Sequence, residues 1–278
     1  MARKTRDEQA NRGRRQGARL AVILAILTAL AGTHSAAQRT VQRLGRQRPE
    51  VILRWQQTLE ESDLRLQAGE WKRVRKMTNR LLNEIGERVE RGPVAPYLAS
   101  AAAQRGIAEA ALGNDRKALW AWEMAVALNP DLAELDLTLY GEGGARLLRQ
   151  REARQSTEFV LLTMPGAEPP RKLAAPSPTY PRAKKIACLE QSIVVDSIID
   201  AEGLPQRPQL RSAAYPVLGF AAMEALRDWR FEPARLDGRA VPVKFSLQAN
   251  FKIKLCQTLV LAIRARGHDK AETAEEVP

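Results

Sequence analysis

The feature that most constrains this chain is an alternation of apolar and polar residues near its C-terminus, from Val241 to Leu255. The odd-numbered residues in it are all apolar: Val241, Val243, Phe245, Leu247, Ala249, Phe251, Ile253 and Leu255. After Pro242, the even-numbered residues are all polar. A period of two predicts a β-strand with one buried face. A long amphipathic strand that ends a small domain leaves a free edge, which is either an aggregation hazard or a docking site.

The residues before this strand predict a hairpin and a helix. Residues 193–199 alternate as a strand, residues 200–203 form a turn, and residues 205–211 are a poorer second strand. Pro216 suits the first turn of a helix. The apolar face of this helix consists of Leu218, Ala222, Ala225 and Trp229. Because the helix is a crossover, the last strand should run antiparallel to the first and lie at an edge. We therefore expect an α+β fold with a three-stranded antiparallel sheet and helices on one face.

Residues 50–155 are predicted to be an all-α domain. Small residues and a proline recur there at steps of seven and five, at Gly106, Gly113, Ala118, Ala125 and Pro130. This spacing resembles a tetratricopeptide repeat, in which small residues let two antiparallel helices pack closely. A peptide-binding groove and a helical spacer remain alternative roles for such a region. The run from Gly141 to Gly144 lacks the context of a phosphate-binding loop and is predicted to be an ordinary loop. A terminal helix from Ala133 to Arg149 is the alternative, which these glycines weaken.

Residues 1–37 are either a cleaved signal peptide or a retained membrane anchor. A basic flank precedes the apolar run Leu20–Gly32, and small residues at 35–37 offer a cleavage point. The stretch between Arg19 and Arg39 has no Asp, Glu, Lys or Arg and is just long enough to span a bilayer. We favour cleavage. Both interpretations place the rest of the chain in the periplasm. It is free there after cleavage, or attached to the inner membrane if the anchor is retained.

Two segments without strong periodicity flank the C-terminal domain. Residues 156–178 are rich in proline and are predicted to be an extended linker that forms neither a helix nor a central strand. Residues 257–278 are a tail whose acidic end is predicted to be disordered.

Five sequence pieces in order resemble the C-terminal domain of the TonB family of energy transducers. They are Y-P-R-A from Tyr180, I-V-V-D-S-I-I-D-A-E-G from Ile193, S-A-A from Ser212, A-A-M-E-A-L-R-D-W-R-F-E-P-A from Ala221, and D-G-R-A-V-P-V-K-F-S-L-Q-A-N-F-K from Asp237. The resemblance covers about residues 178–255 and places a domain at 179–256. The long proline-rich segment of a standard transducer is absent, and the helical region stands in its place.

The resemblance implies a partner and a binding edge. TonB-like domains bind an N-terminal segment of an outer-membrane transporter by adding a strand to the sheet edge. Carried over, the edge consists of Val241, Val243, Phe245, Leu247, Ala249, Phe251 and Ile253, with Tyr180 and Pro181 beside it. Another envelope protein and a second copy of the chain are further candidate partners. An anchored chain would also contact the proton-driven motor of the inner membrane.

Two functions therefore stay open from the sequence. The first is an energy transducer for outer-membrane transport. The second is a soluble periplasmic interaction or scaffold protein that is not coupled to a motor. The mature N-terminus distinguishes them, because a cleaved chain cannot transmit force from the inner membrane.

Few residues suit other chemistry. Cys188 precedes the first predicted strand and Cys256 follows the last, so a disulfide between them is predicted, with two unpaired buried cysteines as the alternative. The only histidines, His34 and His268, lie in the signal region and the tail, which argues against a zinc site or a catalytic triad. The formal net charge is +12, but no block mixes basic and aromatic residues. We expect no enzyme activity, cofactor, metal or nucleic acid.

Overall fold

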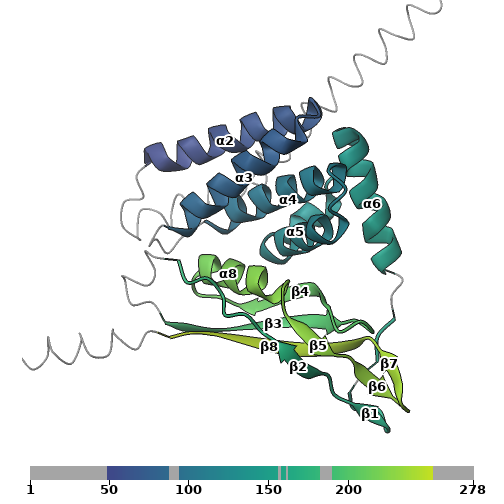
Figure 1. The fold of residues 1–278 in the computed structure, drawn as a ribbon. Helices are drawn as coiled ribbons and strands as arrows, with labels where there is room; N and C mark the ends of the chain where they lie inside the picture. The colour runs from purple at the N-terminus through teal and green to yellow at the C-terminus, as the bar shows by residue number, and fades with distance from the viewer. Residues whose placement is uncertain (1–48, 88–93, 156–157, 161, 182–189, 253–278) are drawn as a thin grey trace, which may run out of the picture. The chain divides into compact units, whose positions relative to one another are not determined.

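The computed structural model describes residues 49–87, 94–155, 158–160, 162–181 and 190–252 (Figure 1). In this part of the chain, residues before 156 are helical. The helices are α2 (Pro49–Gln67), α3 (Trp71–Gly86), α4 (Ala95–Ala111), α5 (Asp115–Leu128), the 3-10 helices η1 (Pro130–Glu134) and η2 (Leu137–Tyr140), and α6 (Gly141–Gln155). No helix within these described ranges is long and apolar enough to cross a membrane, and the run Leu20–Gly32 lies outside them.

Helices α4 and α5 form the closely packed pair that the residue spacing predicted. A Cβ atom at Gly106 would lie only 3.0 Å from the carbonyl oxygen of Ala118 and 3.2 Å from the main-chain nitrogen of Trp122. Only glycine therefore fits at this point without moving α5 away from α4. The antiparallel pair is present, and its assignment as a tetratricopeptide repeat stays a prediction.

The run Gly141–Gly144 forms the first turn of α6, so the loop expected there is wrong, and the alternative of a helix through these glycines is the one observed. A Cβ atom at Gly144 would lie 1.8 Å from the carbonyl oxygen of Leu137, and one at Gly143 would lie 2.8 Å from that of Ile107. These glycines bring α6 close to η2 and α4. Tertiary packing therefore outweighs the low helix propensity of glycine.

The C-terminal domain is built on a three-stranded antiparallel sheet, which confirms the α+β fold. Its strands are β3 (Gln191–Ile199), β4 (Pro205–Ser212) and β8 (Val243–Phe251), in the order β4-β3-β8. The register of β3 and β8 is continuous from Gln191 opposite Phe251 to Ile199 opposite Val243. Strand β8 therefore lies at an edge of this sheet.

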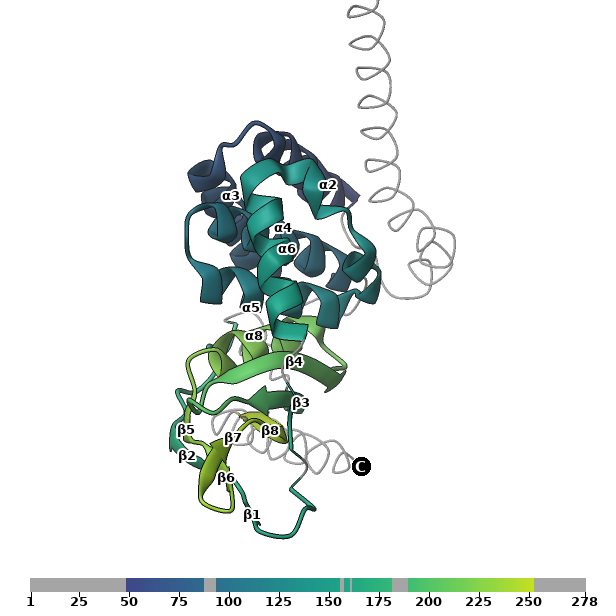
Figure 2. The ribbon, with the colours of Figure 1, turned by 90° about the vertical axis from the view of Figure 1, so that its right-hand side faces the viewer.

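Helix α8 (Pro216–Leu226) covers one face of the sheet and begins with proline in its first turn, as predicted. Leu218 and Ala222 are fully buried against the sheet. Trp229 and Phe231 follow the helix, are also buried, and contact each other at a ring-centroid distance of 6.2 Å. Both ribbon views place α8 between α5 and the sheet (Figures 1 and 2).

Five short strands among the described residues extend the C-terminal domain, and two of them lie in the segment that we expected to be a linker. They are β1 (Ala167–Glu168), β2 (Arg171–Ala174), β5 (Arg230–Glu232), β6 (Ala234–Leu236) and β7 (Arg239–Val241). Strand β1 pairs with β6, and β2 pairs with β5. The segment expected to be only a linker, 156–178, therefore contributes two strands to the folded domain. Its prolines keep these strands short and at sheet edges.

The long strand expected from Val241 to Leu255 is broken at Pro242. Val241 ends β7 and pairs with Ala234 in the sheet β1-β6-β7, whereas Val243 begins β8. The chain passes from one sheet to the other at Pro242, where the alternation of side chains continues without interruption. Ile253 and Leu255 lie outside the described residues.

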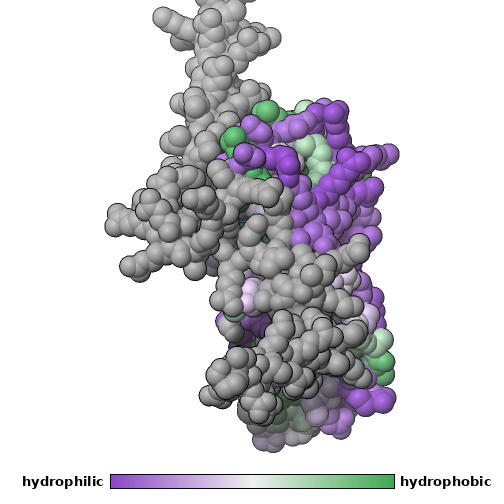
Figure 3. All heavy atoms as spheres, turned by 90° about the vertical axis from the view of Figure 1, so that its left-hand side faces the viewer, coloured by the Kyte–Doolittle hydropathy of each residue, from purple (hydrophilic) through white to green (hydrophobic). Residues whose placement is uncertain are grey.

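The described surface carries few large apolar side chains. Those that are exposed are Leu53, Leu64, Phe159, Met164 and Leu173. The side of the molecule drawn in Figure 3 is mainly hydrophilic over the described helical region, with small separate hydrophobic areas.

Candidate functional site: the edge of strand β8

Within the described residues, strand β8 has β3 on one side and an open edge on the other over most of its length. Among the described strands, only β3 pairs with it. One residue outside the named strands reaches the open side, because Val160 forms a parallel bridge with Val243. In this bridge, the amide of Val160 donates a 2.8 Å hydrogen bond to the carbonyl of Pro242.

This bond shows which main-chain groups face outward. The N–H and C=O of one strand residue point to the same edge, and the next residue points to the opposite edge. Because the Pro242 carbonyl faces outward, the even-numbered residues Lys244, Ser246, Gln248 and Asn250 present their main-chain groups to the open edge. Pro242 itself fits this pattern, since its missing N–H would face away from β3.

The two faces of β8 differ in chemistry. Val243, Leu247, Ala249 and Phe251 are buried, while Phe245 is half-buried and contacts Phe231 at 6.5 Å between ring centroids. The even-numbered side chains on the other face are exposed. A strand added at the edge would therefore meet an apolar layer on one face and a polar layer on the other.

Asp196 of β3 ties the three strands together on the polar face. Its carboxylate accepts hydrogen bonds from Ser246 Oγ of β8 at 2.7 Å and from Arg211 Nε of β4 at 2.9 Å. Burial alone would raise the pKa of Asp196, but these two bonds and the positive charge of Arg211 outweigh it and hold the pKa below its ordinary value. Asp196 therefore stays ionised and fixes the position of β8.

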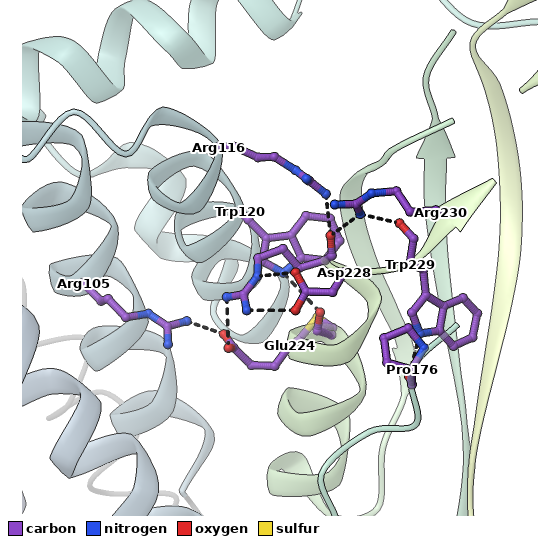
Figure 4. Close-up of polar contacts among 10 residues, drawn as sticks. Arg105, Arg116, Trp120, Pro176, Glu224, Asp228, Trp229 and Arg230 are labelled. Atoms are coloured by element: carbon purple, nitrogen blue, oxygen red, sulfur yellow. Dashed lines mark hydrogen bonds and ion pairs between the residues drawn. The ribbon is translucent and has the colours of Figure 1, made fainter. Parts of the chain in front are cut away.

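The segment around Tyr180 lies beside the end of β8. The Tyr180 ring meets Phe251 edge to face, with centroids 5.1 Å apart, and Pro181 is buried. The indole of Trp229 donates a 3.0 Å hydrogen bond to the carbonyl of Pro176 (Figure 4). These contacts hold residues 176–181 against the domain.

The helical region contacts the domain on the side of α8, away from the β8 edge. Figure 4 shows Arg105 of α4 and Trp120 of α5 reaching toward α8. Arg105 pairs with Glu224, and the Trp120 indole donates to the carbonyl of Met223 at 3.1 Å. Arg116 donates to the carbonyl of Arg227. Within residues 54–252, the two regions are thus joined by buried and charged contacts that leave the edge accessible.

A second set of contacts joins α5 and α6 to strand β4. Glu123 accepts from the amide of Arg207 at 3.0 Å and pairs with Arg154 at 3.2 Å. Burial raises the pKa of Glu123, while Arg154 and the amide of Arg207 oppose this effect. Arg207 has φ of 50°, a conformation that non-glycine residues adopt rarely. Glu123 therefore holds a strained position of β4.

The structure also contains a cavity of about 710 Å³ between α3, α4, α8 and residues 176–181. Apolar residues such as Leu82 and Phe220 line it together with charged residues. Of these, Glu224 is neutralised by Arg105 and Arg227. Among the described residues, no three His, Cys, Asp or Glu side chains come together as a metal site would require.

The structure brings most of the residues singled out from the sequence to one place. Val243, Phe245, Leu247, Ala249, Phe251, Tyr180 and Pro181 lie on or beside β8. Val241 belongs to β7 instead, and Ile253, Cys188 and Cys256 lie outside the described residues, so the disulfide stays a prediction. Sequence reasoning missed Val160 and the role of Asp196 in joining the three strands. The polar residue Asp196 within an apolar strand was a visible signal, whereas nothing in the sequence pointed to Val160.

The described fold is a small α+β domain that ends in an edge strand, preceded by a helical region. Residues 176–253 match the family model described as Gram-negative bacterial TonB protein C-terminal. This part of the chain is a TonB C-terminal domain.

Two known proteins are similar to part of this chain. Protein TonB of Vibrio cholerae serotype O1 (strain ATCC 39315 / El Tor Inaba N16961) is 31% identical over 78 residues, 28% of this chain and 32% of that protein. The chain thus matches about a third of the length of this curated relative. A solution NMR structure of the Pseudomonas aeruginosa TonB CTD is 23% identical, with 35% of this chain and 97% of that chain covered and a TM-score of 0.28.

Proposed function

We propose that this chain is a periplasmic TonB-family energy transducer for outer-membrane transport. In this role it binds an extended segment of a transporter by adding a strand to β8. The observation that carries the proposal is the open edge of β8, where Lys244, Ser246, Gln248 and Asn250 direct their main-chain groups outward. The membership of residues 176–253 in the TonB C-terminal family supports the same partner class.

Main-chain pairing explains how one edge could serve several transporters. Each outward N–H and C=O offers a hydrogen bond to any extended segment, so affinity depends little on the partner's side chains. The two faces of β8 then favour a partner segment in which apolar and polar residues alternate. Its apolar residues would lie beside Phe245 and its polar residues beside Ser246 and Gln248. Lys244 adds a positive charge that favours an acidic residue on the polar face.

Energy transduction further requires a link to the inner membrane. The proposal therefore requires the alternative to the cleavage that the sequence favours. Residues 20–37 remain as an anchor and contact a proton-driven motor, while the helical region takes the place of a proline-rich spacer. N-terminal sequencing of the mature protein from membranes tests this part directly. A start near Gln38 would exclude force transmission and leave a soluble periplasmic binding protein.

The edge itself is tested by a matched pair of substitutions at Gln248. Gln248→Pro removes an outward N–H without removing a bond to β3, whereas Gln248→Ala keeps that N–H and removes only the side chain. The purified chain is titrated with synthetic N-terminal segments of the outer-membrane transporters of the same organism. We expect Gln248→Pro to weaken binding at least tenfold and Gln248→Ala to leave it within about twofold, with the same order in uptake assays. Equal binding by both variants would exclude strand addition at β8.

A further inference from the structure

A residue of the chain itself already occupies one end of the β8 edge. Val160 lies parallel to Val243, and its amide donates to the carbonyl of Pro242 at 2.8 Å. We infer that Glu158–Val160 is a resident strand that competes with a partner strand for the N-terminal end of this edge. The inference rests on the proposed function, because it concerns the same edge.

Competition follows from the position of the bridge. A partner strand that pairs with the full edge needs the Pro242 carbonyl and the outward groups of Lys244. Val160 already uses the Pro242 carbonyl, so both strands cannot lie there together. Beyond this point, residues 245–251 have no other strand on their outer side within the described part of the chain. A partner strand can therefore pair with Pro242 and Lys244, at the N-terminal end of the edge, only by displacing Val160.

The resident strand is held mainly by its main chain. Glu158 and Phe159 are exposed, and Val160 is half-buried. Displacement therefore uncovers little apolar surface, and the chief loss is one main-chain hydrogen bond. Such a contact is weak enough for a partner strand to replace.

A short tether keeps this weak contact in place. The Arg154 side chain pairs with Glu123 at 3.2 Å, and the Arg154 carbonyl accepts from Arg207 at 2.6 Å. Val160 lies six positions after this fixed point. A short tether gives an effective concentration in the millimolar range, which allows a single bridge to persist.

The size of the effect follows from the contact that is lost. One main-chain hydrogen bond corresponds to roughly a two- to tenfold change in an equilibrium constant. Val160→Pro removes the N–H donor, so this variant should bind a partner strand two- to tenfold more tightly than the unchanged chain. Val160→Ala keeps the N–H and should bind within about twofold of the unchanged chain.

The probe is a fluorescein-labelled peptide with the sequence of residues 158–163 of this chain, E-F-V-L-L-T. Anisotropy titrations use the full chain, Val160→Pro, Val160→Ala and Val160→Pro combined with Gln248→Pro. We expect the tightest binding for Val160→Pro alone and loss of binding in the double variant. Equal affinity of Val160→Pro and the unchanged chain would overturn the inference. An equal gain in Val160→Ala would also overturn it, because the side chain and not the N–H would then be responsible.

Amide hydrogen exchange gives a second measurement on the unchanged chain. We expect the Val160 amide to be protected in the free protein and to lose protection when the peptide saturates the edge. Protection that persists at saturation would overturn competition. If no variant binds the peptide, the inference also fails, whereas the proposed function is decided separately by the transporter segments and the Gln248 pair.

Discussion

The indole Nε1–H of Trp120 donates a 3.1 Å hydrogen bond to the main-chain carbonyl of Met223. This bond joins α5 of the helical region to α8 of the TonB C-terminal domain. Trp120 is almost fully buried, so the bond lies in a place that water does not reach. Within residues 54–252, the helical region therefore stabilises the C-terminal domain through this buried bond.

Trp120→Phe should therefore destabilise the protein although it keeps an aromatic ring. The substitution removes the donor to Met223 and leaves a small void, which should lower the free energy of unfolding by about 1–3 kcal/mol. Urea unfolding measures the change. Trp71→Phe, at the half-buried start of α3, is the control and should change stability by less than about 0.5 kcal/mol. Equal losses in both variants would contradict a special role for the Trp120 bond.

The ion pair between Arg105 and Glu224 should show measurable coupling. Its side chains are 12% and 27% exposed, so solvent screens it less than a surface pair. A double-mutant cycle with alanine should give a coupling of about 1 kcal/mol. The pair Arg171–Glu232 is the control, because its side chains are 74% and 42% exposed and its coupling should stay below about 0.5 kcal/mol. Coupling that is no larger for Arg105 and Glu224 would show that this interface pair is not stabilising.

Asp63 predicts a stability change with pH inside the helical region. It accepts hydrogen bonds from Tyr140 and Gln67, both at 2.9 Å, but burial dominates and raises its pKa above the ordinary value of 3.8. A raised folded pKa adds stability below the unfolded pKa, and this stability is lost as pH rises through the folded pKa. The stability of the unchanged chain relative to Asp63→Asn should therefore fall between about pH 4 and neutrality. Urea unfolding of both proteins across this range tests it, and a constant or rising difference would contradict it.

For Asp196 we expect the opposite dependence of stability on pH. Hydrogen bonds from Ser246 and Arg211 outweigh burial and lower its pKa, so its contribution is present above the unfolded pKa and is lost as pH falls through the folded pKa. Because Arg211 is largely exposed, Asp196→Asn should cost only about 1 kcal/mol at neutral pH. This cost should shrink well below pH 3.8, the ordinary value for the group. Urea unfolding of both proteins at neutral and acid pH measures this difference in stability. A loss of stability on Asp196→Asn that grows in acid would contradict the prediction.

Gly203→Ala should be among the most damaging single changes in the domain. Gly203 has φ of 77°, and an added Cβ would lie 1.8 Å from the carbonyl oxygen of Phe231. Gly238→Ala is the matched control, because Gly238 has φ of 79° with open space around it. The control should lose about 1–2 kcal/mol from backbone strain alone. Gly203→Ala should lose more than about 4 kcal/mol or fail to fold, as measured by soluble yield and unfolding. Similar losses would mean that the turn shifts to relieve the contact.

The sequence by itself determined the main strands and the helix of the C-terminal domain, and the family that this domain resembles. Alternation from Ile193 and from Val241 was enough to predict the strands that became β3 and β8, and Pro216 marked the start of a helix. The order of the motifs identified the TonB C-terminal domain. These features are local, because a period of two or of 3.6 depends only on which side chains face a core.

The tertiary structure decided which strands pair and what lies at the edge. The alternation runs unchanged through Pro242, yet Val241 pairs with Ala234 and Val243 pairs with Ile199. Val160 reaches the edge by main-chain hydrogen bonding, which leaves no side-chain pattern to read. The position of Trp120 against Met223 likewise depends on residues about a hundred positions apart. A sequence pattern reports the faces of a strand, whereas its edges are set by whichever distant segment lies beside it.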